Sequence, residues 1–397
     1  MLYKELFGLN LSRLGFGTMR LPLLEPNGRI DESKAMEMVE YAYAKGINYY
    51  DTAYFYHSGK SQEFICKALS QFPRDSWYMA NKFPGNMLSA NNGVLKLGLG
   101  GFNMEDATFG SPAEIFERQI ELCGVDYFDF YLLHNLDETT YDLYTDDEVG
   151  IIDCMLNEKK RGRIRRLGVS VHCTPETIEK FLNLRDCFEY VQMQLNYLDW
   201  SLQDAGKMYD IITRFGLPVI VMEPVRGGKL AKLSDESRAI MEAVRPGDTP
   251  ASWAFRFVQS LPNVAVVLSG MTTIEQLKEN IEIFSKDDPM ADSEKVVLQQ
   301  VADNLADLFP CTSCRYCCGV CPQKLDIPLL LNTYSEASVE FSWYVNGVLR
   351  ELSDSERPEA CTGCGTCIPV CPQNIDIPGA ISKFTALIKA KSERQTG

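Results

Sequence analysis

The sequence predicts an α/β protein made of a (β/α)8 barrel and a smaller C-terminal α+β domain. Up to about residue 285, short apolar runs alternate with amphipathic stretches, an alternation typical of parallel α/β architecture. Eight such units fit a closed barrel better than an open doubly wound sheet. Near Phe309 the composition changes abruptly, because nine of the fourteen cysteines lie between Cys311 and Cys371.

Eight apolar runs are the candidate strands of the barrel. They span residues 13–19, 48–53, 77–82, 128–134, 166–171, 190–196, 218–223 and 264–269. Several of the helices between them begin where a hydroxyl residue precedes proline, as at Ser111, Thr174 and Thr249. The hydroxyl caps free backbone N–H groups, and proline has no N–H to leave unpaired at the first helical position.

One segment, residues 85–110, interrupts this alternation after the third strand. It is rich in Gly and Asn and is longer than the usual connection from a strand to a helix. Because such loops surround the catalytic mouth of a barrel, we expect it over the active-site face. It is either a lid that selects substrate or a passive insertion.

The predicted boundaries are a barrel over residues 1–285, a helical connector over 286–308 and a second domain over 309–397. The second domain contains two cysteine motifs, which begin fifty residues apart at Cys311 and Cys361. A partly helical stretch separates the motifs, and an amphipathic helix over residues 378–391 is expected to close the chain. The second domain is therefore an internal duplication.

Composition argues against several classes of partner. A formal net charge of −15 would repel a phosphate backbone, and no cluster of Lys and Arg interleaved with aromatic residues offsets it. The sequence shows no secretory signal and no apolar run near the ~20 residues that span a bilayer. We expect a cytoplasmic protein that binds neither nucleic acid nor membrane, in a reducing compartment that would suit an anaerobe. The acidic surface would suit a basic redox protein partner.

Each cysteine motif has the spacing C-x-x-C-x-x-C-x-x-x-C-P. In a two-cluster protein, three thiolates of such a motif wrap one [4Fe-4S] cluster and the fourth, beside the proline, reaches the other. One cluster is expected on Cys311, Cys314, Cys317 and Cys371, and the other on Cys361, Cys364, Cys367 and Cys321. Across both motifs the region resembles bacterial two-cluster ferredoxins, which implies a ferredoxin-like domain and electron transfer.

A pair of structural zinc sites is the alternative interpretation of these motifs. Zinc ribbons, however, use paired C-x-x-C knuckles and need neither the third close cysteine nor the final Cys-Pro. Cys318 is spare in this count and is expected to be a buried neighbour of a cluster. The barrel cysteines are expected to be small buried hydrophobic residues, and they are Cys66, Cys123, Cys154, Cys173 and Cys187.

Four polar residues lie at or just after the ends of the second, third and fourth strands, namely Asp51, Tyr56, Lys82 and His134. Strand ends of a barrel converge on one site. An ammonium near a phenol lowers a pKa that is about 10 in water, and a carboxylate anchors the ammonium. Tyr56 is therefore expected to be the acid/base, and His134 to orient a carbonyl oxygen beside it. Each residue taken singly could be structural.

Over its first 285 or so residues the chain resembles the aldo-keto reductase family of TIM barrels. Asp51, Tyr56, Lys82 and His134 match the catalytic tetrad of that family in order and context. Further matches cover residues 14–19, 124–129, 164–170, 192–196 and 249–256. The resemblance implies an oxidoreductase that reduces a carbonyl, or oxidises an alcohol, by hydride transfer with a nicotinamide cofactor.

The positions that bind the cofactor in this family are only partly kept. The resemblance assigns them to Gly17, Thr18, Ser170, Gln192, Met222, Ser269, Gly270, Gln276 and Asn280. Ser170 and Gln192 match residues that hold the nicotinamide carboxamide, but Val171 stands where the family has Asn and Met222 where it has a stacking aromatic ring.

The adenosine end of the cofactor site also departs from the family. Gly270 and Gln276 stand where NADP-dependent members carry Lys and Arg, so a preference for NADP(H) is not supported. NAD(H) remains open, and so does a flavin. Asn280 and the helix start near Thr272 or Thr273 could cradle a phosphate.

Other polar residues at the barrel mouth have competing interpretations. His57 is expected to be structural, and His172 to make either a substrate contact or a structural hydrogen bond. Glu223, Arg226 and Lys229 follow the seventh strand and either contact the cofactor or an acidic substrate, or are only solvated.

The leading hypothesis is an aldo-keto reductase with electron-transfer clusters attached. Hydride carries two electrons, whereas each [4Fe-4S] cluster passes one, so a direct link between them needs a two-electron relay. One alternative is a ferredoxin-coupled reductase that uses a barrel-bound flavin or direct electron transfer from cluster to substrate. A third hypothesis is a non-catalytic electron-transfer subunit, but the presence of the tetrad argues against it. A fourth is that the clusters serve only structure or oxygen sensing, with ordinary nicotinamide chemistry in the barrel.

Overall fold

The computed structural model describes residues 1–25, 29–91, 94–98, 106–306, 311, 315–339, 341, 343–371 and 375–396. The chain divides into two compact units, Met1–Leu298 and Gln299–Gly397, and each has an apolar core of its own. The division falls inside helix α12 (Asp292–Ala306), which lies in the segment 286–308 that we expected to be a helical connector.

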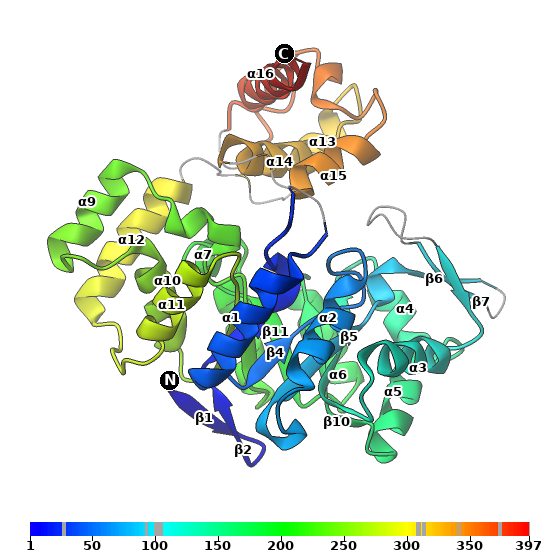
Figure 1. The fold of residues 1–397 in the computed structure, drawn as a ribbon. Coiled ribbons are helices and arrows are strands. Elements are labelled where there is room, and N and C mark those ends of the chain that lie inside the picture. Colours follow the sequence, from blue (N-terminus) through cyan, green and yellow to red (C-terminus); the bar gives the residue numbers. More distant parts are fainter. Residues whose placement is uncertain are drawn as a thin grey trace. The chain divides into compact units, whose positions relative to one another are not determined.

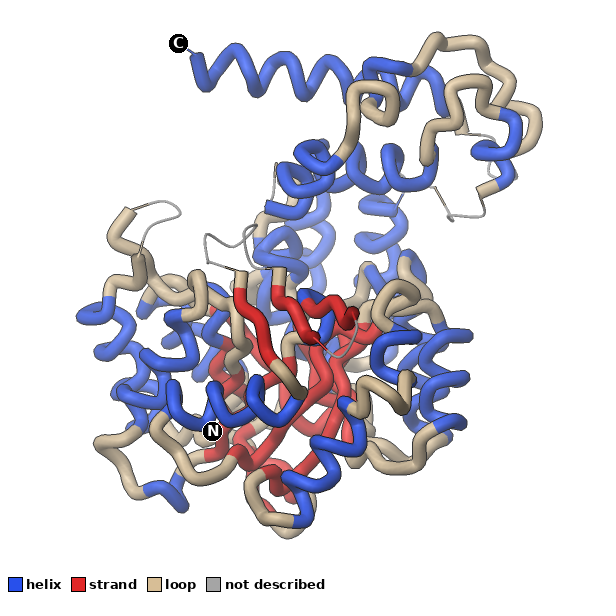
Figure 2. The backbone as a smooth tube through the Cα atoms, turned by 90° about the vertical axis from the view of Figure 1, so that its right-hand side faces the viewer, coloured by secondary structure: helices blue, strands red, loops and turns tan. Residues whose placement is uncertain are grey.

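Eight parallel strands of the first unit close into a barrel, which confirms the predicted fold class (Figure 1). They are β3 (Leu14–Gly17), β4 (Tyr49–Asp51), β5 (Tyr78–Phe83), β9 (Phe128–Leu136), β10 (Ile164–Val171), β11 (Tyr190–Gln194), β12 (Val219–Met222) and β13 (Val264–Gly270). They follow chain order around the ring, and β13 pairs with β3 to close it. Figure 2 shows these strands enclosed by helices.

The helices of the first unit connect successive strands. They are α1 (Glu32–Ala44), α2 (Lys60–Leu69), α3 (Pro112–Cys123), α4 (Tyr141–Thr145), α5 (Ile151–Lys160), α6 (Pro175–Leu184), α7 (Asp199–Leu202), α8 (Ala205–Arg214), α9 (Asp235–Val244), α10 (Pro250–Gln259) and α11 (Ile274–Ile283). The hydroxyls of Ser111, Thr174 and Thr249 cap α3, α6 and α10. Among the helices that the structure describes, none is long and apolar enough to cross a membrane.

An antiparallel hairpin of β1 (Tyr3–Leu6) and β2 (Leu9–Ser12) precedes the barrel and was not among the predicted elements. Leu11 of this hairpin is fully buried in one cluster with Tyr49, Phe130 and Ile220 from the barrel strands. Each hairpin strand is only four residues long, so its alternation of apolar and polar residues is too short to stand out in the sequence.

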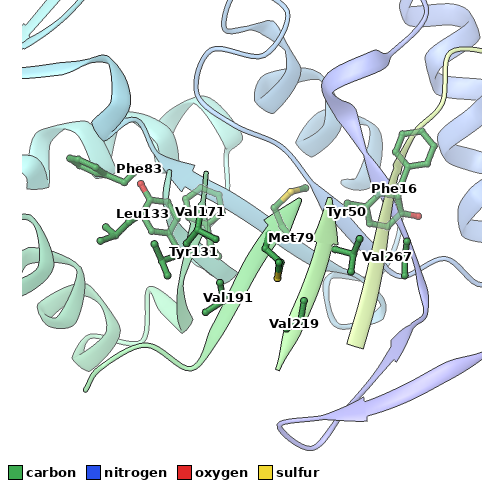
Figure 3. Close-up of a cluster of buried hydrophobic side chains, with 14 of the residues drawn as sticks. Phe16, Tyr50, Met79, Phe83, Tyr131, Leu133, Val171, Val191, Val219 and Val267 are labelled. Atoms are coloured by element: carbon green, nitrogen blue, oxygen red, sulfur yellow. The ribbon is translucent and has the colours of Figure 1, made fainter. Parts of the chain in front are cut away.

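A larger apolar layer joins the strands to the surrounding helices. Figure 3 shows Phe16, Met79, Leu133 and Val191 of this layer, which come from four different strands. The barrel strands are therefore buried on both faces, as parallel strands usually are. Burial of each such side chain contributes about 1.5–3 kcal/mol, so the strand ends that carry the site belong to a strongly stabilised scaffold.

The segment 85–110 is more than a loop. It contains the 3-10 helix η3 (Gly85–Met87) and a three-stranded antiparallel sheet of β6 (Leu88–Asn91), β7 (Val94–Leu97) and β8 (Ala107–Phe109). Leu95 and Leu97 are buried in the barrel core, whereas Val94 and Lys96 are exposed. This two-residue period ties the described part of the segment to the barrel.

A buried ion pair attaches α12 to α10. Arg256 donates to the Glu294 carboxylate from Nη1 at 2.9 Å and from Nη2 at 2.8 Å, and Arg245 Nη1 lies 3.2 Å from Glu294 Oε1. The hydrogen bonds from Arg256 hold the pKa of Glu294 down at about 2. A carboxylate in a bidentate pair is expected to shift in this direction.

We expect the Glu294→Gln variant to lose about 2 kcal/mol of unfolding free energy at neutral pH, as is typical when a hydrogen bond to a charged group is removed. The folded-state pKa of Glu294 lies below its ordinary value of 4.5. Its stabilisation is therefore complete above pH 4.5 and is lost as the pH falls towards 2. Denaturant unfolding of both proteins should show the full difference at about pH 7 and a clearly smaller one at about pH 3. An equal difference at both pH values would contradict this.

The described elements of the second unit are helices. They are α13 (Tyr316–Val320), α14 (Ile327–Val339), α15 (Trp343–Glu351), the 3-10 helix η6 (Pro358–Ala360) and α16 (Ile377–Thr396). Strands of an α+β domain are not among the residues described here, because α14 and α15 fill most of the stretch between the two cysteine motifs. The terminal helix α16 covers the range expected to be helical and packs Phe384 against Tyr334 of α14.

The fifty-residue period of the second unit is also a structural repeat. Asp326 Oδ1 accepts a hydrogen bond from Leu329 N at 3.3 Å at the start of α14. Fifty residues on, Asp376 Oδ1 accepts one from Gly379 N at 3.1 Å at the start of α16. Each cysteine motif is thus followed by a helix that is capped in the same way.

Candidate active site and cluster sites

A buried ion pair lies at the carboxyl ends of β4 and β5. Lys82 Nζ donates to Asp51 Oδ1 at 2.7 Å and to Thr52 O at 2.7 Å, and Lys82 is fully buried. Burial raises the pKa of Asp51 and lowers that of Lys82, while their attraction opposes both shifts. Among the described residues, Asp51 Oδ2 has no hydrogen-bond partner, so Lys82 is the cation that compensates this carboxylate.

Tyr56 and His134 face this pair. Lys82 Nζ lies over the Tyr56 ring, 5.0 Å from its centroid. The rings of Tyr56 and His134 are 6.1 Å apart and meet edge to face at 80°. The imidazole of His134 is stacked on Phe55, with centroids 4.9 Å apart and 5° between the planes. The four residues of the predicted tetrad therefore lie together, and Phe55, which the sequence did not single out, orients the imidazole.

The prediction that the pKa of Tyr56 is lowered is wrong. Burial raises the pKa of Tyr56 well above its ordinary value of 10, and the charges of Asp51 and Glu223 raise it further. The charge of Arg20 acts in the opposite direction but is the smallest of these effects. Tyr56 is thus a neutral phenol, the form that can donate a proton.

The imidazole of His134 is neutral as well. Burial first, and then the charge of Lys82, lower the pKa of His134 well below its ordinary value of 6.5. Its Nδ1 is buried and has no hydrogen-bond partner in the part of the chain that the structure describes. On the backbone of His134, the carbonyl oxygen accepts a hydrogen bond from Tyr144 Oη at 2.6 Å. Tyr144 also packs so closely on Gly85 that a Cβ there would lie 2.3 Å from its hydroxyl oxygen.

A chain of buried hydroxyls holds the backbone beside Asp51. Thr18 Oγ1 donates to Asp51 O at 2.9 Å and accepts from Ser61 Oγ at 2.6 Å, and Ser61 Oγ lies 3.0 Å from Thr52 Oγ1. The resemblance assigned Thr18 to the cofactor site. Thr18 is fully buried, and its hydroxyl donates to Asp51 O instead. Its neighbour Gly17 lets β3 end against β13, because a Cβ there would lie 3.3 Å from a β13 carbonyl oxygen.

Polar groups suited to an amide lie at the ends of β10 and β11. Ser170 and Gln192 are paired across the ladder. Gln192 Oε1 is buried and none of the described residues bonds to it, while Gln192 Nε2 lies 3.7 Å from Met222 Sδ. Ser170 Oγ accepts from Asn135 N at 2.8 Å, which leaves its O–H to donate. A carboxamide offers the donor that Gln192 needs and the acceptor that Ser170 needs.

The helix start that was expected to cradle a phosphate is filled by its own side chain. Gln276 Oε1 accepts from Thr272 N at 2.8 Å and from Thr273 N at 3.3 Å, at the start of α11. The amide of Gln276 thus occupies donors that a phosphate would need. Asn280 Nδ2 donates to Ser269 Oγ at 3.0 Å, so these two predicted cofactor residues bond to each other.

Arg20, in the 3-10 helix η1 (Thr18–Arg20), covers Gly270. A Cβ on Gly270 would lie 3.1–3.2 Å from the aliphatic carbons of Arg20, so glycine makes room for this arginine. Arg20 Nη2 lies 3.6 Å from Glu223 Oε1. The sequence did not single out Arg20, because the two segments that meet are about 250 residues apart.

The remaining mouth residues are held by specific contacts. Arg226, at the start of η5 (Arg226–Ala231), donates from Nε to Asp199 Oδ1 at 3.1 Å, and Asp199 is fully buried. Lys229 lies in the same 3-10 helix. His57 Nε2 lies 3.0 Å from Thr18 O, the structural contact that was expected, while His172 is exposed.

Four cysteines of the second unit line one cavity, and they are Cys321, Cys361, Cys364 and Cys367. This is the set that the spacing assigns to one cluster. Burial raises the pKa of Cys367, and the charges of the other three thiols raise it further, so the four are near neighbours. Within the part of the chain that is described, no three Cys, His, Asp or Glu side chains are grouped as ligands of a single metal ion would be.

The other predicted set is described only in part, since Cys314 lies outside the described residues. Burial raises the pKa of Cys317 to about 12, and the nearby thiols of Cys318 and Cys311 contribute. Cys371 is partly buried against the same core. Cys318 is thus a close neighbour of the predicted ligand Cys317.

Comparison with known proteins decides the family. The model of the aldo/keto reductase family matches residues 13–297, well over half of the chain. The chain belongs to the aldo/keto reductase family. A second model, the 4Fe-4S dicluster domain, matches residues 310–376. The protein is therefore an oxidoreductase in which an aldo/keto reductase barrel is followed by an iron–sulfur domain.

Relatives of this aldo/keto reductase cover the barrel. A probable aldo-keto reductase of Glycine max is 24% identical over 304 residues, which covers 69% of this chain and 81% of that protein. An NADH-specific methylglyoxal reductase of Escherichia coli is 22% identical over 330 residues, which covers 75% of this chain and 96% of that protein. The solved holo form of an aldo-keto reductase from Bacillus halodurans shares the fold, with a TM-score of 0.59, 23% identity, and coverage of 75% of this chain and 95% of that one.

Proposed function

We propose that this aldo/keto reductase reduces a small carbonyl compound to an alcohol, with Tyr56 as the proton donor and a nicotinamide as the hydride donor. The observation that carries the proposal is the buried Lys82–Asp51 pair, with Lys82 lying over the Tyr56 ring and His134 edge-on to that ring. A carbonyl oxygen between the phenol and the imidazole would accept hydrogen bonds from both.

Each residue of the predicted tetrad has its own role in this reaction. Tyr56 gives its proton to the carbonyl oxygen as negative charge develops there, and the Lys82 ammonium stabilises the tyrosinate that remains. Asp51 keeps Lys82 charged and in place. His134, neutral and fixed by Phe55, donates a hydrogen bond that orients the carbonyl group. The substrate gains one hydride on carbon and one proton on oxygen, a two-electron reduction that runs in reverse as alcohol oxidation.

A bound nicotinamide would supply the hydride. The unpaired Gln192 Oε1 and the O–H of Ser170 fit its carboxamide. We propose NAD(H) rather than NADP(H), because Gly270 and Gln276 bring no cation for a 2′-phosphate and Arg20 faces Glu223. The NADH-specific reductase among the relatives is in keeping with this choice. Neither matching family model gives support to a flavin.

We also propose that the eight motif cysteines hold two [4Fe-4S] clusters that transfer single electrons. The match to a dicluster domain and the cavity lined by four cysteines support this. One ligand set is Cys311, Cys314, Cys317 and Cys371, and the other is Cys321, Cys361, Cys364 and Cys367. A cluster passes one electron, whereas a hydride carries two. We therefore propose that the clusters exchange electrons with a separate redox protein and not with the hydride-transfer site of the barrel.

The Cys367→Ala variant is expected to lose one of the two clusters, about four of eight irons, because it removes one of four thiolates around the cavity. Iron analysis and visible absorption of anaerobically purified protein measure this. Cys318→Ala is the matched control, since this cysteine is spare in the motif, and it should keep all the iron. Equal loss in both variants would contradict the assignment of ligands.

Two measurements test the function. Anaerobic protein should oxidise NADH only when a small aldehyde or ketone, such as methylglyoxal, is present. No oxidation across a panel of carbonyl compounds would overturn the proposed reduction. Titration of the cluster absorbance with NADH, then NADPH, then dithionite tests the separation of clusters from hydride chemistry. Bleaching by dithionite alone supports the separation, and bleaching by a nicotinamide overturns it.

A further inference from the structure

A fully buried network of side-chain amides lies against the backbone of Lys82. Lys82 N donates to Asn81 Oδ1 at 2.8 Å, and Lys82 O accepts from Gln119 Nε2 at 3.1 Å. The ladder between β4 and β5 ends at the pair Asp51 and Ala80, two residues before Lys82. The ladder between β5 and β9 continues through Lys82 and Leu132, and on the side where β4 has ended side-chain amides bond to both backbone groups of Lys82.

The network continues into the layer between the barrel and helices α2 and α3. Gln62 Oε1 accepts from Asn81 Nδ2 at 3.0 Å and from Gln119 Nε2 at 3.3 Å, and Gln119 Oε1 accepts from the hydroxyl of Tyr131. Gln62, Asn81, Gln119 and Tyr131 are all 0% exposed. Each amide is therefore held by at least two partners, which leaves little freedom for the peptide groups on either side of Lys82.

The composition of this layer makes the network unusual. Tyr131 is packed among apolar residues such as Phe83 and Leu133 (Figure 3). Burying polar amides in such a layer is unfavourable unless every group is paired, and among the described residues Gln62 Nε2 has no partner. The hydrogen bonds of the network do not remove this cost, so the network is poorly explained by stability alone.

We propose that Gln119, together with Asn81 and Gln62, is a positioning residue that sets the place of the Lys82 ammonium between Asp51 and the Tyr56 ring. The proposal rests on the proposed function of Tyr56 as proton donor. Lys82 Nζ must stay 2.7 Å from Asp51 Oδ1 and 5.0 Å from the Tyr56 centroid to stabilise the tyrosinate. Its side chain starts from the segment of backbone that Gln119 and Asn81 hold.

The test uses the Gln119→Met variant, which keeps the length of the side chain and loses its hydrogen bonds. We expect kcat for carbonyl reduction to fall about tenfold to a hundredfold, because a misplacement of about 1 Å can cost that much. KM should change less than about twofold, and the alkaline limb of the pH profile of kcat should shift, since the charge that stabilises the tyrosinate has moved. Tyr131→Phe, which removes one bond to Gln119, should give a smaller change in the same direction.

Phe116→Leu is the control, because Phe116 lies one turn earlier on α3, is fully buried and makes ring contacts instead of these hydrogen bonds. It should lower the Tm and leave kcat and the pH profile unchanged. Crystal structures of the wild type and of Gln119→Met add a readout that needs no turnover, the separation of Lys82 Nζ from Asp51 Oδ1. We expect it to lengthen in the variant.

The outcomes separate the two proposals. An unchanged Lys82–Asp51 separation, or a Gln119→Met enzyme that behaves like Phe116→Leu, overturns the positioning role. Full activity of Tyr56→Phe overturns the proposed function instead, and the separation of Lys82 from Asp51 then still decides whether Gln119 places the ammonium.

Discussion

The Tyr56→Phe variant is expected to reduce carbonyl compounds about 10²- to 10⁴-fold more slowly than the wild type, the range that a positioned acid contributes. Phenylalanine fills the same space, so the ring beneath Lys82 and beside His134 remains. Only the hydroxyl and its proton are lost. The measurement is kcat for carbonyl-dependent oxidation of NADH, with the cluster absorbance as a check on the second unit.

Tyr54→Phe is the control for this variant. Tyr54 is a buried tyrosine two residues earlier, and it lies outside the proposed proton path. Its loss of a hydroxyl should change kcat less than about twofold. If Tyr56→Phe and Tyr54→Phe are equally active, Tyr56 is not the proton donor, and reduction fed by the clusters becomes the better hypothesis.

Lys82→Met is expected to destabilise the barrel by about 3–5 kcal/mol as well as to abolish activity, because it leaves the Asp51 carboxylate buried without its cation. Asp51 Oδ2 already lacks a hydrogen-bond partner among the described residues, so none of these supplies a donor that would compensate the charge. Asp51→Asn should cost a similar amount, since it leaves the ammonium of Lys82 without its anion. Denaturant unfolding followed by a signal from the barrel measures both.

The double variant Asp51→Asn, Lys82→Met tests whether the two charges depend on each other. With both charges removed, neither is left unpaired, so the double variant should be more stable than either single variant and still inactive. Losses that simply add would contradict the pair as the source of the effect. Recovery of activity in the double variant would remove Lys82 from the mechanism.

Much of the barrel was predictable because its signals are local. Each of the eight apolar runs overlaps one barrel strand, although β5, β9, β10 and β13 extend one or two residues beyond the predicted bounds. Ser111, Thr174 and Thr249 cap the helices that they were expected to start. The hairpin of β1 and β2 and the sheet of β6, β7 and β8 were missed, because strands of three or four residues show too little alternation.

The sequence predicted which residues come together at the candidate site. It did not predict the pKa values of those residues. Asp51, Lys82 and His134 are strand-end residues, so their convergence follows from barrel geometry. The pKa of Tyr56 does not follow from residue types, because it depends on burial and on Glu223, a residue far away in the chain. Gln276 was assigned to the cofactor site from its position in the sequence. In the structure its side chain caps its own helix instead.

The sequence by itself determined the class of fold, the resemblance to the family, the residues of the predicted tetrad and the spacing of the motif cysteines. Each of these depends on short motifs or on the period of apolar residues. Only the tertiary structure decided that Arg20 covers Gly270, that Phe55 stacks on His134 and that Gln119 bonds to Lys82. The physical reason is that desolvation and hydrogen bonding depend on which distant segments meet in space, whereas propensities and motif spacings act over a few neighbouring residues.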